Sequence, residues 1–331
     1  MSDLLTKIRP VKEEDKEILP IFSYSRLDTF KQCPMRYKLK YIENKYTDET
    51  TLSLEFGTLL HYILEQKGKA LIEKNKINYD ELFDFLENGG TVEDDKTHQT
   101  ILGVNQLKKK YFEIWYEKNE KSGLTYEDKI SNYKKILYTE MEDSENWEPY
   151  KLEYPFEFVW DDRVIFGGFI DRIDIKYIDK TPYYRTIDYK SSNSVYPDKN
   201  LPTALQFVIY ALAIYNEFGV LPEENIYRFI TLDQTQKALS IGWEKRAEKA
   251  LDKLFNLLDE CQVNGIYKPS PSPLCFYCNY SLTNQNKGVK LYNNECQYYS
   301  NWNPNDRKNF TVNKKWEEGI DNKESKRKLV F

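Results

Sequence analysis

The chain has 331 residues, of which 40% are hydrophobic and 31% are charged, and this is the composition of an ordinary soluble globular protein. No apolar run approaches the roughly 20 residues that a membrane span needs, and the N-terminus has no apolar signal core, so we expect a cytoplasmic protein with no membrane partner. A net charge of −5 is unusual for a nucleic-acid binder, yet a groove needs only a local positive surface, so that class is not excluded.

The first half of the chain is predicted to be mainly helical. Residues 1–20 form a polar lead-in, and residues 21–64 carry the first helices. From Leu54 to Leu64 the apolar residues recur with the 3.6-residue period of a helix. Residues 65–148 continue with helical patterns, and we interpret them as a helical insertion into the main fold.

Residues 149–265 have the character of an α/β core. Apolar residues recur with a period of two at Leu152, Tyr154, Phe156, Phe158 and Trp160, which predicts a half-buried strand, and Asp161-Asp162 predicts a turn. The further predicted elements are strands over 163–175, 183–190, 226–232 and 238–243, a buried helix over 203–218 and a helix ending at Cys261. Residues 266–300 form a cysteine-bearing module, and residues 301–331 form a polar tail.

An acidic and basic pair stands on the strand predicted over 183–190. Period-two geometry places Asp188 and Lys190 on the same face, where they are either a simple ion pair or part of a site. On the preceding strand, Asp171 shares a face with apolar residues, a position that is costly unless a cation or a partner receives it. Asp174 lies on the other face, where it has an exit and pairs with a basic side chain. Two carboxylates beside a lysine are suited to Mg²⁺ or Mn²⁺.

Three polar residues on helices are further candidates. His61 lies at the edge of an apolar stripe, one turn after Gly57, a residue that permits close approach of another backbone or a ligand. It is either a structural histidine or a metal ligand. Gln206 and Tyr210 share one face of an otherwise apolar helix, so they either hydrogen-bond to the sheet or orient Lys190 and the substrate.

Five cysteines in a cytosolic chain argue against a disulfide framework and leave metal binding or inert burial. Cys275 and Cys278 form a C-x₂-C pair, and Cys33 and Cys296 lie far from it in the sequence. Cys261, inside a predicted helix with leucines nearby, is expected to be an inert buried thiol.

The motifs in this order resemble the RecB-type, AddB-like nucleases of the PD-(D/E)XK superfamily. They are a Ser-x-Ser-x-Leu opening before Cys33-Pro34, then G-x-x-x-H from Gly57 to His61, G-x-I-D from Gly168 to Asp171, D-x-K from Asp188 to Lys190, and Q-x-x-x-Y from Gln206 to Tyr210. Each motif is weak alone, but five in the family's order are a specific signal. The resemblance implies a restriction-endonuclease-like α/β core with a mixed sheet flanked by helices.

The resemblance also implies residue roles. The divalent metal would be bound by His61, Asp171, Asp188 and the main-chain carbonyl of Tyr189, while Lys190 would orient the attacking water. Cys33, Cys275, Cys278 and Cys296 resemble the iron–sulfur subset of the family, which implies a [4Fe–4S] cluster joining the N- and C-terminal segments, with zinc as the alternative. The interval from Cys278 to Cys296 is longer than in that subset.

The implied function is a metal-dependent deoxyribonuclease. We expect an exonuclease that acts on DNA ends or single strands in recombination, repair or phage DNA processing, with a helicase or recombination protein as partner. No phosphate-binding loop of the helicase type is present in the sequence. Two alternatives remain open: a non-catalytic module that binds DNA ends or a partner and uses the cysteines as a zinc or iron–sulfur staple, and a structural zinc protein with no nucleic-acid role.

Overall fold

A computed structural model describes residues 3–46, 50–93, 98–112, 126–142, 145–192, 194–197, 201, 204–238, 243–270, 272, 275, 278–280 and 296. The chain forms two compact units. The first, here called the sheet unit, comprises residues 1–24 and 50–248. The second, here called the cysteine unit, comprises residues 25–49 and 249–331.

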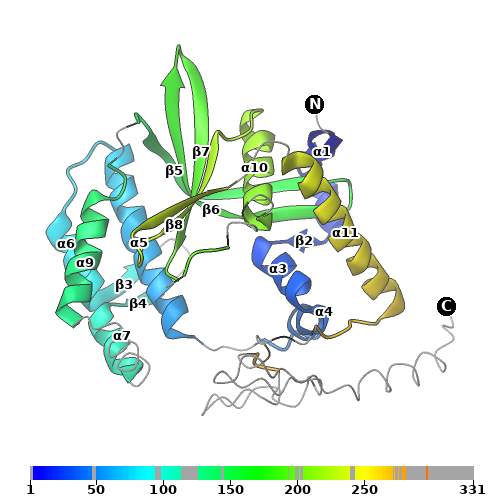
Figure 1. The fold of residues 1–331 in the computed structure, drawn as a ribbon, viewed down its shortest axis with the longest axis horizontal. Coiled ribbons are helices and arrows are strands. Elements are labelled where there is room, and N and C mark those ends of the chain that lie inside the picture. Colours follow the sequence, from blue (N-terminus) through cyan, green and yellow to red (C-terminus); the bar gives the residue numbers. More distant parts are fainter. Residues whose placement is uncertain are drawn as a thin grey trace. The chain divides into compact units, whose positions relative to one another are not determined.

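The described part of the sheet unit is built on a mixed seven-stranded sheet, which confirms the predicted fold class (Figure 1). Its strand order is β1-β5-β6-β7-β8-β9, and β2 pairs in parallel with β6 outside this path. Strands β7 and β8 are parallel, whereas the other neighbours on the path are antiparallel. The strands are β1 (Ile8–Arg9), β2 (Ile21–Phe22), β5 (Glu148–Trp160), β6 (Val164–Ile178), β7 (Thr181–Lys190), β8 (Glu224–Phe229) and β9 (Gln234–Ala238).

Two tight hairpins hold β5, β6 and β7 in sequence order. The first turns at Asp161-Asp162, as predicted, and the second at Asp179-Lys180. All four turn residues have positive φ, between 47° and 68°. Positive φ at both central residues gives a turn whose twist matches that of the strands. The β6–β7 loop has only these two residues, whereas the β5–β6 loop also contains Arg163. Asp tolerates this conformation better than most residues, which explains the composition of these turns.

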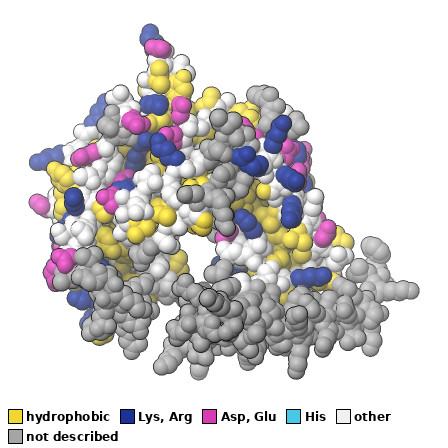
Figure 2. Space-filling model, viewed as in Figure 1, with side chains coloured by type: hydrophobic (Ala, Val, Ile, Leu, Met, Phe, Trp, Pro, Cys, Tyr) yellow, Lys and Arg dark blue, Asp and Glu magenta, His cyan; other side chains and the backbone are white. Residues whose placement is uncertain are grey.

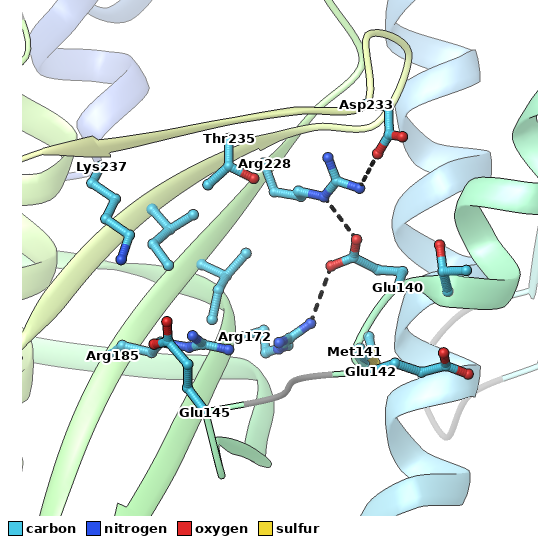
Figure 3. Close-up of a pocket in the computed structure, with 13 residues that line it drawn as sticks. Glu140, Met141, Glu142, Glu145, Arg172, Arg185, Arg228, Asp233, Thr235 and Lys237 are labelled. Atoms are coloured by element: carbon cyan, nitrogen blue, oxygen red, sulfur yellow. Dashed lines mark hydrogen bonds and ion pairs between the residues drawn. The ribbon is translucent and has the colours of Figure 1, made fainter.

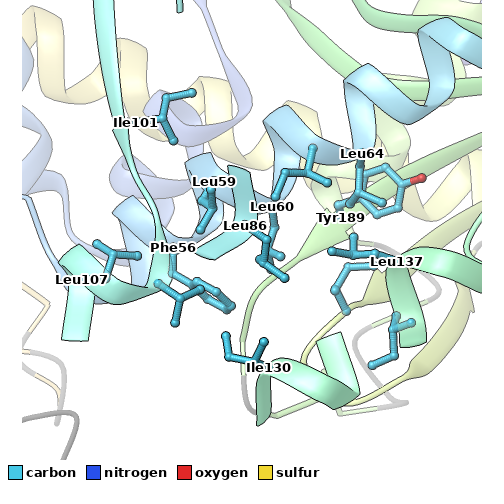
Figure 4. Packing of buried hydrophobic residues seen from close by; sticks show 14 of the residues in the cluster. Phe56, Leu59, Leu60, Leu64, Leu86, Ile101, Leu107, Ile130, Leu137 and Tyr189 are labelled. Atoms are coloured by element: carbon cyan, nitrogen blue, oxygen red, sulfur yellow. The ribbon is translucent and has the colours of Figure 1, made fainter. Parts of the chain in front are cut away.

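Helices α5 (Leu52–Ile72) and α10 (Leu205–Phe218) cover opposite faces of the sheet. Ile187 and Tyr189 of β7 pack in one hydrophobic cluster with the apolar side of α5 (Figure 4). Asp188, between them, hydrogen-bonds instead to side chains of α10. Successive residues of a strand point to opposite faces, so this alternation at β7 assigns one helix to each face.

Residues 65–148, predicted to be a helical insertion, contain a hairpin that the helical patterns did not predict. The described elements between α5 and β5 are α6 (Tyr79–Asn88), β3 (Gly89–Glu93), β4 (His98–Leu102), α7 (Val104–Lys110) and α9 (Tyr126–Thr139). Gly89 starts β3 at φ 63°, and a Cβ there would lie 2.2 Å from the Ile101 carbonyl oxygen, so only glycine fits. Lys67 of α5 is 2% exposed and donates hydrogen bonds to the last carbonyls of α9, at Leu137 and Tyr138. These bonds satisfy carbonyls that the end of a helix leaves unpaired.

The two strands that end the strand path, β1 and β9, differ from the sequence-based prediction. The lead-in over residues 1–20 contributes α1 (Asp3–Thr6), β1 and α2 (Glu13–Ile18), and β1 pairs with β5. Of the strand predicted over 238–243, Ala238 belongs to β9 and Trp243 begins a helix, whereas residues 239–242 lie outside the described residues. Strands β1 and β9 end the strand path and carry polar residues, so neither shows the apolar alternation that identifies a central strand.

The cysteine unit joins segments from both ends of the chain. It contains most of α3 (Tyr24–Gln32), then α4 (Pro34–Tyr37), a short π-helix (Lys38–Ile42) and most of α11 (Trp243–Asn264). Leu39, Tyr280 and Cys296 form a small buried cluster against Met35 and Cys278. The predicted polar tail over residues 301–331 lies outside the described residues. Among the helices that are described, none is both long enough and apolar enough to cross a membrane.

Candidate active site

Two of the predicted site carboxylates lie on neighbouring strands where the β6–β7 ladder ends. Its last main-chain pair on this side is Arg172↔Ile187. One residue further along, the Asp171 carboxylate accepts a hydrogen bond of 2.8 Å from the main-chain N–H of Tyr189. The Asp171 carboxylate therefore accepts the hydrogen bond that a main-chain carbonyl of β6 would accept if the ladder continued. This bond holds the Asp171 carboxylate against the D-x-K segment of β7.

Asp188 is held by polar side chains from β7 and α10. It is 2% exposed, forms an ion pair with Lys190, and accepts hydrogen bonds from Gln206 Nε2 and, at 3.2 Å, from the Tyr210 hydroxyl. Lys190 Nζ also donates to Gln206 Oε1 at 3.2 Å. Gln206 thus links the acid and the base of the D-x-K motif through the two ends of its amide. Gln206 and Tyr210, two polar residues buried on the apolar helix α10, both hydrogen-bond to this pair.

His61 reaches the same place from α5. Its Nε2 lies 3.1 Å from the main-chain oxygen of Tyr189, and its Nδ1 lies 3.6 Å from Asp171 Oδ2. Gly57, one turn earlier, is close to the chain that follows β7: a Cβ at Gly57 would lie 3.3 Å from Ser191 Oγ. The glycine therefore allows α5 to approach the end of β7, and His61 follows it into the site.

Glu153 of β5 is a site residue that the sequence did not single out. Its Oε1 lies 3.8 Å from His61 Nδ1, and ligand atoms of Glu153, His61 and Asp171 all lie within 4.8 Å of one another. Among the described residues this is the group suited to hold a metal ion. In the sequence Glu153 occupies the polar phase of an alternating strand, where a solvated glutamate is ordinary. Only its position opposite β6 in the folded sheet distinguishes Glu153 from an ordinary solvated glutamate.

The electrostatics of the site favour a bound cation. Burial, together with the nearby Asp188, raises the pKa of Asp171 to about 7, while His61 and the Tyr189 N–H act in the opposite direction. Burial by itself lowers the pKa of His61, but Glu153, Asp171 and Asp188 together raise it to about 9. Burial likewise lowers the pKa of Lys190, while Asp188 raises it above its ordinary value. An excess of buried negative charge is the common cause, and a divalent cation would offset it.

Asp174 lies on the other face of the sheet from Asp171 and Asp188, where it pairs with a network of arginines. Figure 3 shows Arg172, Arg185 and Arg228 of this network. Its carboxylate accepts hydrogen bonds from Arg172, at 2.5 and 2.7 Å, and from Arg185, at 2.9 Å. The prediction that Asp174 pairs with basic side chains is confirmed. The expectation that it has an exit is wrong, because its exposure is 0%: Arg172 and Arg185 cover it from both sides.

The arginine network lines a cavity of about 450 Å³ and anchors the side chain of Tyr189. Glu140, which follows α9, pairs with Arg172 and Arg228, and Arg172 donates a 2.7 Å hydrogen bond to the Tyr189 hydroxyl. Tyr189 therefore contacts His61 and Asp171 through its main chain, while its ring lies edge-on to His61 and its hydroxyl joins this network. In the cavity the arginines already pair with carboxylates, so we assign the network a structural role.

The predicted cysteine ligands all lie in the cysteine unit. Cys33 precedes α4, and its Sγ accepts a hydrogen bond from the Ser270 N–H, while Cys275 Sγ accepts one from the Ser272 N–H, each at 3.4 Å. Burial raises the pKa of Cys278, and the nearby Cys33 and Cys275 thiols raise it further. Cys261 of α11 is 5% exposed, so its predicted burial is confirmed.

The fold and the order of these residues agree with comparison to known proteins. Residues 21–282 match the PD-(D/E)XK nuclease superfamily, and the chain belongs to that superfamily. The sequence-based recognition of this nuclease family is thereby confirmed, whereas its iron–sulfur subset stays a prediction.

Individual relatives are similar to this chain at low identity. The Gene 69 protein of Mycobacterium phage L5 is 24% identical over 298 residues, which cover 81% of this chain and 98% of that protein. The B-subunit of an ATP-dependent helicase/deoxyribonuclease of Clostridium botulinum (strain Loch Maree / Type A3) is 29% identical over 258 residues, covering 70% of this chain and 21% of the B-subunit. The protein of the same name from Clostridium perfringens (strain SM101 / Type A) is 26% identical over 235 residues, covering 66% and 19%. The chain thus spans about a fifth of each clostridial relative.

Proposed function

We propose that the protein is a metal-dependent deoxyribonuclease that hydrolyses phosphodiester bonds with Mg²⁺ or Mn²⁺. The observation that carries the proposal is the meeting of Asp171, Asp188 and Lys190 with His61, in a chain of the nuclease superfamily. The choice of DNA as substrate rests on the two clostridial relatives, whose names include a deoxyribonuclease. Carboxylate oxygens and an imidazole nitrogen are a donor set suited to either cation.

In this proposal His61, Asp171 and Asp188 hold the cation, which lowers the pKa of a water and offsets charge on the phosphoryl oxygens. Lys190 orients the attacking water and stabilises the negative charge that develops in the transition state. Gln206 and Tyr210 keep Asp188 and Lys190 in place, because their hydrogen bonds fix both side chains. The hydrogen bond from the Tyr189 N–H fixes Asp171 in the same way.

We further propose that the enzyme is an exonuclease that acts on DNA ends or single strands, in recombination, repair or phage DNA processing. The phage relative, aligned over 98% of its length, supports the phage setting, and the two helicase/deoxyribonuclease relatives support action on DNA. The same clostridial relatives support a helicase or recombination protein as partner. On the face shown in Figure 2 the Lys and Arg side chains are interspersed with Asp and Glu. Local contacts at the site, in place of a broad basic field, would then position the DNA.

The test is incubation of the purified chain with end-labelled single-stranded DNA, linear duplex and a covalently closed duplex circle. Each substrate is incubated with Mg²⁺, with Mn²⁺ or with a chelator. We expect cleavage of the single strand or the linear ends only when a cation is present. Rapid cutting of the closed circle would contradict the exonuclease. Binding of DNA ends without any cleavage would instead favour the alternative, a non-catalytic module of the same fold.

The affinity of the site for Mn²⁺ is expected to rise with pH. Metal ligands must be deprotonated, so the cation displaces a proton from His61 up to about pH 9, and from Asp171 also below about pH 7. The Kd should then fall about tenfold per pH unit between these two values and more steeply below them. Calorimetric titration across this range measures the slope. His61→Ala should abolish the dependence between pH 7 and 9, and a slope retained in that variant would contradict His61 as a ligand.

We also propose that Cys33, Cys275, Cys278 and Cys296 hold a [4Fe–4S] cluster, with zinc as the alternative metal. The four residues belong to one unit, two of their sulfurs accept main-chain N–H bonds, and Cys278 packs in the same cluster as Cys296. Such a group would tie the N-terminal segment that carries Cys33 to the C-terminal one. Four thiolates satisfy the donor set of either metal.

Loss of one of these thiolates is expected to lower the stability of the cysteine unit severely. Cys33→Ser and Cys275→Ser remove a ligand, whereas Cys261→Ser, at a buried thiol in α11, is the matched control and should be mild. Anaerobically purified protein should be brown and contain about four irons per chain. Stoichiometric zinc without iron would exclude the cluster, and the absence of both metals would exclude the cysteine site altogether.

A further inference from the structure

We propose that Glu153 is a ligand of the catalytic cation, and that it binds this cation together with His61 Nδ1 and Asp171. The inference rests on the proposed function, because it concerns the same cation. It adds a residue that the nuclease motifs do not include, and it changes the part played by the Tyr189 carbonyl.

The strand register places two carboxylates directly opposite each other. In the β5–β6 ladder, Leu152 pairs with Arg172 and Tyr154 pairs with Ile170, so Glu153 lies opposite Asp171. Like charges at directly opposed positions destabilise a sheet. The Asp171 side chain is 12% exposed and that of Glu153 is 37% exposed, so water screens this repulsion only in part. A cation between the two carboxylates converts the repulsion into attraction.

The main chain of β5 turns Glu153 toward this position. Glu153 has a φ of 42°, a conformation that a glutamate rarely adopts within a strand. The side chains on either side of it point in different directions. Leu152 lies against Gly68 of α5, whereas Tyr154 stacks on Phe218 of α10. At Glu153 the side chains of β5 therefore change from the sheet face covered by α5 to the face covered by α10. The Glu153 carboxylate is directed at His61.

The two nitrogens of His61 have different partners. Nε2 is 3.1 Å from the Tyr189 carbonyl oxygen, which is a hydrogen-bond distance. Nδ1 is 3.6 Å from Asp171 Oδ2 and 3.8 Å from Glu153 Oε1, which is too long for hydrogen bonds. Neighbouring ligands of a Mg²⁺ ion lie about 3 Å apart, and opposite ligands about 4 Å apart. The Nδ1 side is therefore the side on which three donors can share a cation.

In this arrangement the Tyr189 carbonyl is a hydrogen-bond acceptor for His61 and not a ligand of the cation. A metal-bound histidine usually donates its other ring N–H to a carboxylate or a main-chain carbonyl, which fixes the ring orientation. The Tyr189 carbonyl is the acceptor that fills this role for Nε2. The Tyr189 side chain is in turn anchored by Arg172, on the face of the sheet that α5 covers. Tyr189 then positions His61 and does not itself bind the cation.

The first experiment compares Mn²⁺ binding to the full chain in the wild type, Glu153→Gln and Glu157→Gln. Glu157 is the matched control, because it lies on the same strand, is exposed and pairs with Lys16. We expect Glu153→Gln to weaken Mn²⁺ binding tenfold or more, at roughly the scale seen for residues that support metal ligands. Glu157→Gln should bind within about twofold of the wild type. Wild-type affinity in Glu153→Gln would overturn the inference.

Two further measurements distinguish a ligand from other roles. Mn²⁺ should raise the Tm of Glu153→Gln less than it raises that of the wild type. In a His61→Ala background, Glu153→Gln should weaken binding again. No further loss there would mean that Glu153 acts only through His61, and would overturn its assignment as a ligand. A wild type that binds Mn²⁺ in a Glu153-dependent way but cleaves no DNA would refute the nuclease proposal alone.

Discussion

Asp188→Asn is expected to lower the rate of DNA cleavage by at least about a thousandfold while the chain stays folded. The substitution keeps the shape of the side chain, so Gln206 and Tyr210 retain an oxygen to which they donate. It removes the negative charge that the cation and Lys190 require. Metal-ion catalysis supplies several kcal/mol of transition-state stabilisation, and about 1.4 kcal/mol corresponds to a tenfold change in rate.

Lys190→Met tests whether metal binding and DNA cleavage depend on different residues of the site. Lys190 is expected to bind no metal, so this variant should retain Mn²⁺ affinity while cleavage falls by a similar factor. Cleavage rates on end-labelled DNA at saturating Mn²⁺, together with calorimetric Kd values and circular dichroism, measure both effects. Near-wild-type cleavage in Asp188→Asn would show that the D-x-K motif is not the catalytic centre. A loss of metal binding in Lys190→Met would show that the lysine acts on the cation site itself.

Asp174→Ala is expected to destabilise the fold more than any surface substitution, by about 3–5 kcal/mol. The carboxylate is fully buried and neutralises both Arg172 and Arg185, so its removal leaves two guanidinium groups without their central partner. The lost charge also loosens the network through which Arg172 holds the Tyr189 hydroxyl. Urea unfolding, followed by fluorescence, measures the change in the free energy of unfolding.

The matched control is Asp233→Ala, which also removes a partner of an arginine. Asp233 pairs with Arg228, but its side chain is 63% exposed, so its loss should cost less than about 1 kcal/mol. Equal free energies of unfolding for Asp174→Ala and the wild type would contradict the structural role of the network. Because of its burial, Asp174→Ala is also unsuitable as a neutral comparison for Asp171 variants, although Asp174 faces away from the active site.

Local patterns in the sequence were sufficient for much of the fold and for most of the candidate site. The alternation around β5, the Asp161-Asp162 turn and the apolar run of α10 predicted these elements, because side-chain periodicity and turn chemistry are properties of the local chain. The same periodicity placed Asp188 and Lys190 on one face of β7 and separated Asp171 from Asp174. His61, Gln206 and Tyr210 were found from polar residues at fixed spacings on apolar helices.

Only the tertiary structure decided which distant residues meet. Glu153 looks like a solvated strand residue until the β5–β6 register places it opposite Asp171. Asp174 looks exposed until Arg185 of the next strand covers it, and the polar strands β1 and β9 are recognised only by their partners in the sheet. Register and strand pairing arise from packing between segments that are far apart in the chain. The periodicity of a sequence indicates on which face of its strand a residue lies, but not which residue of the neighbouring strand lies opposite it.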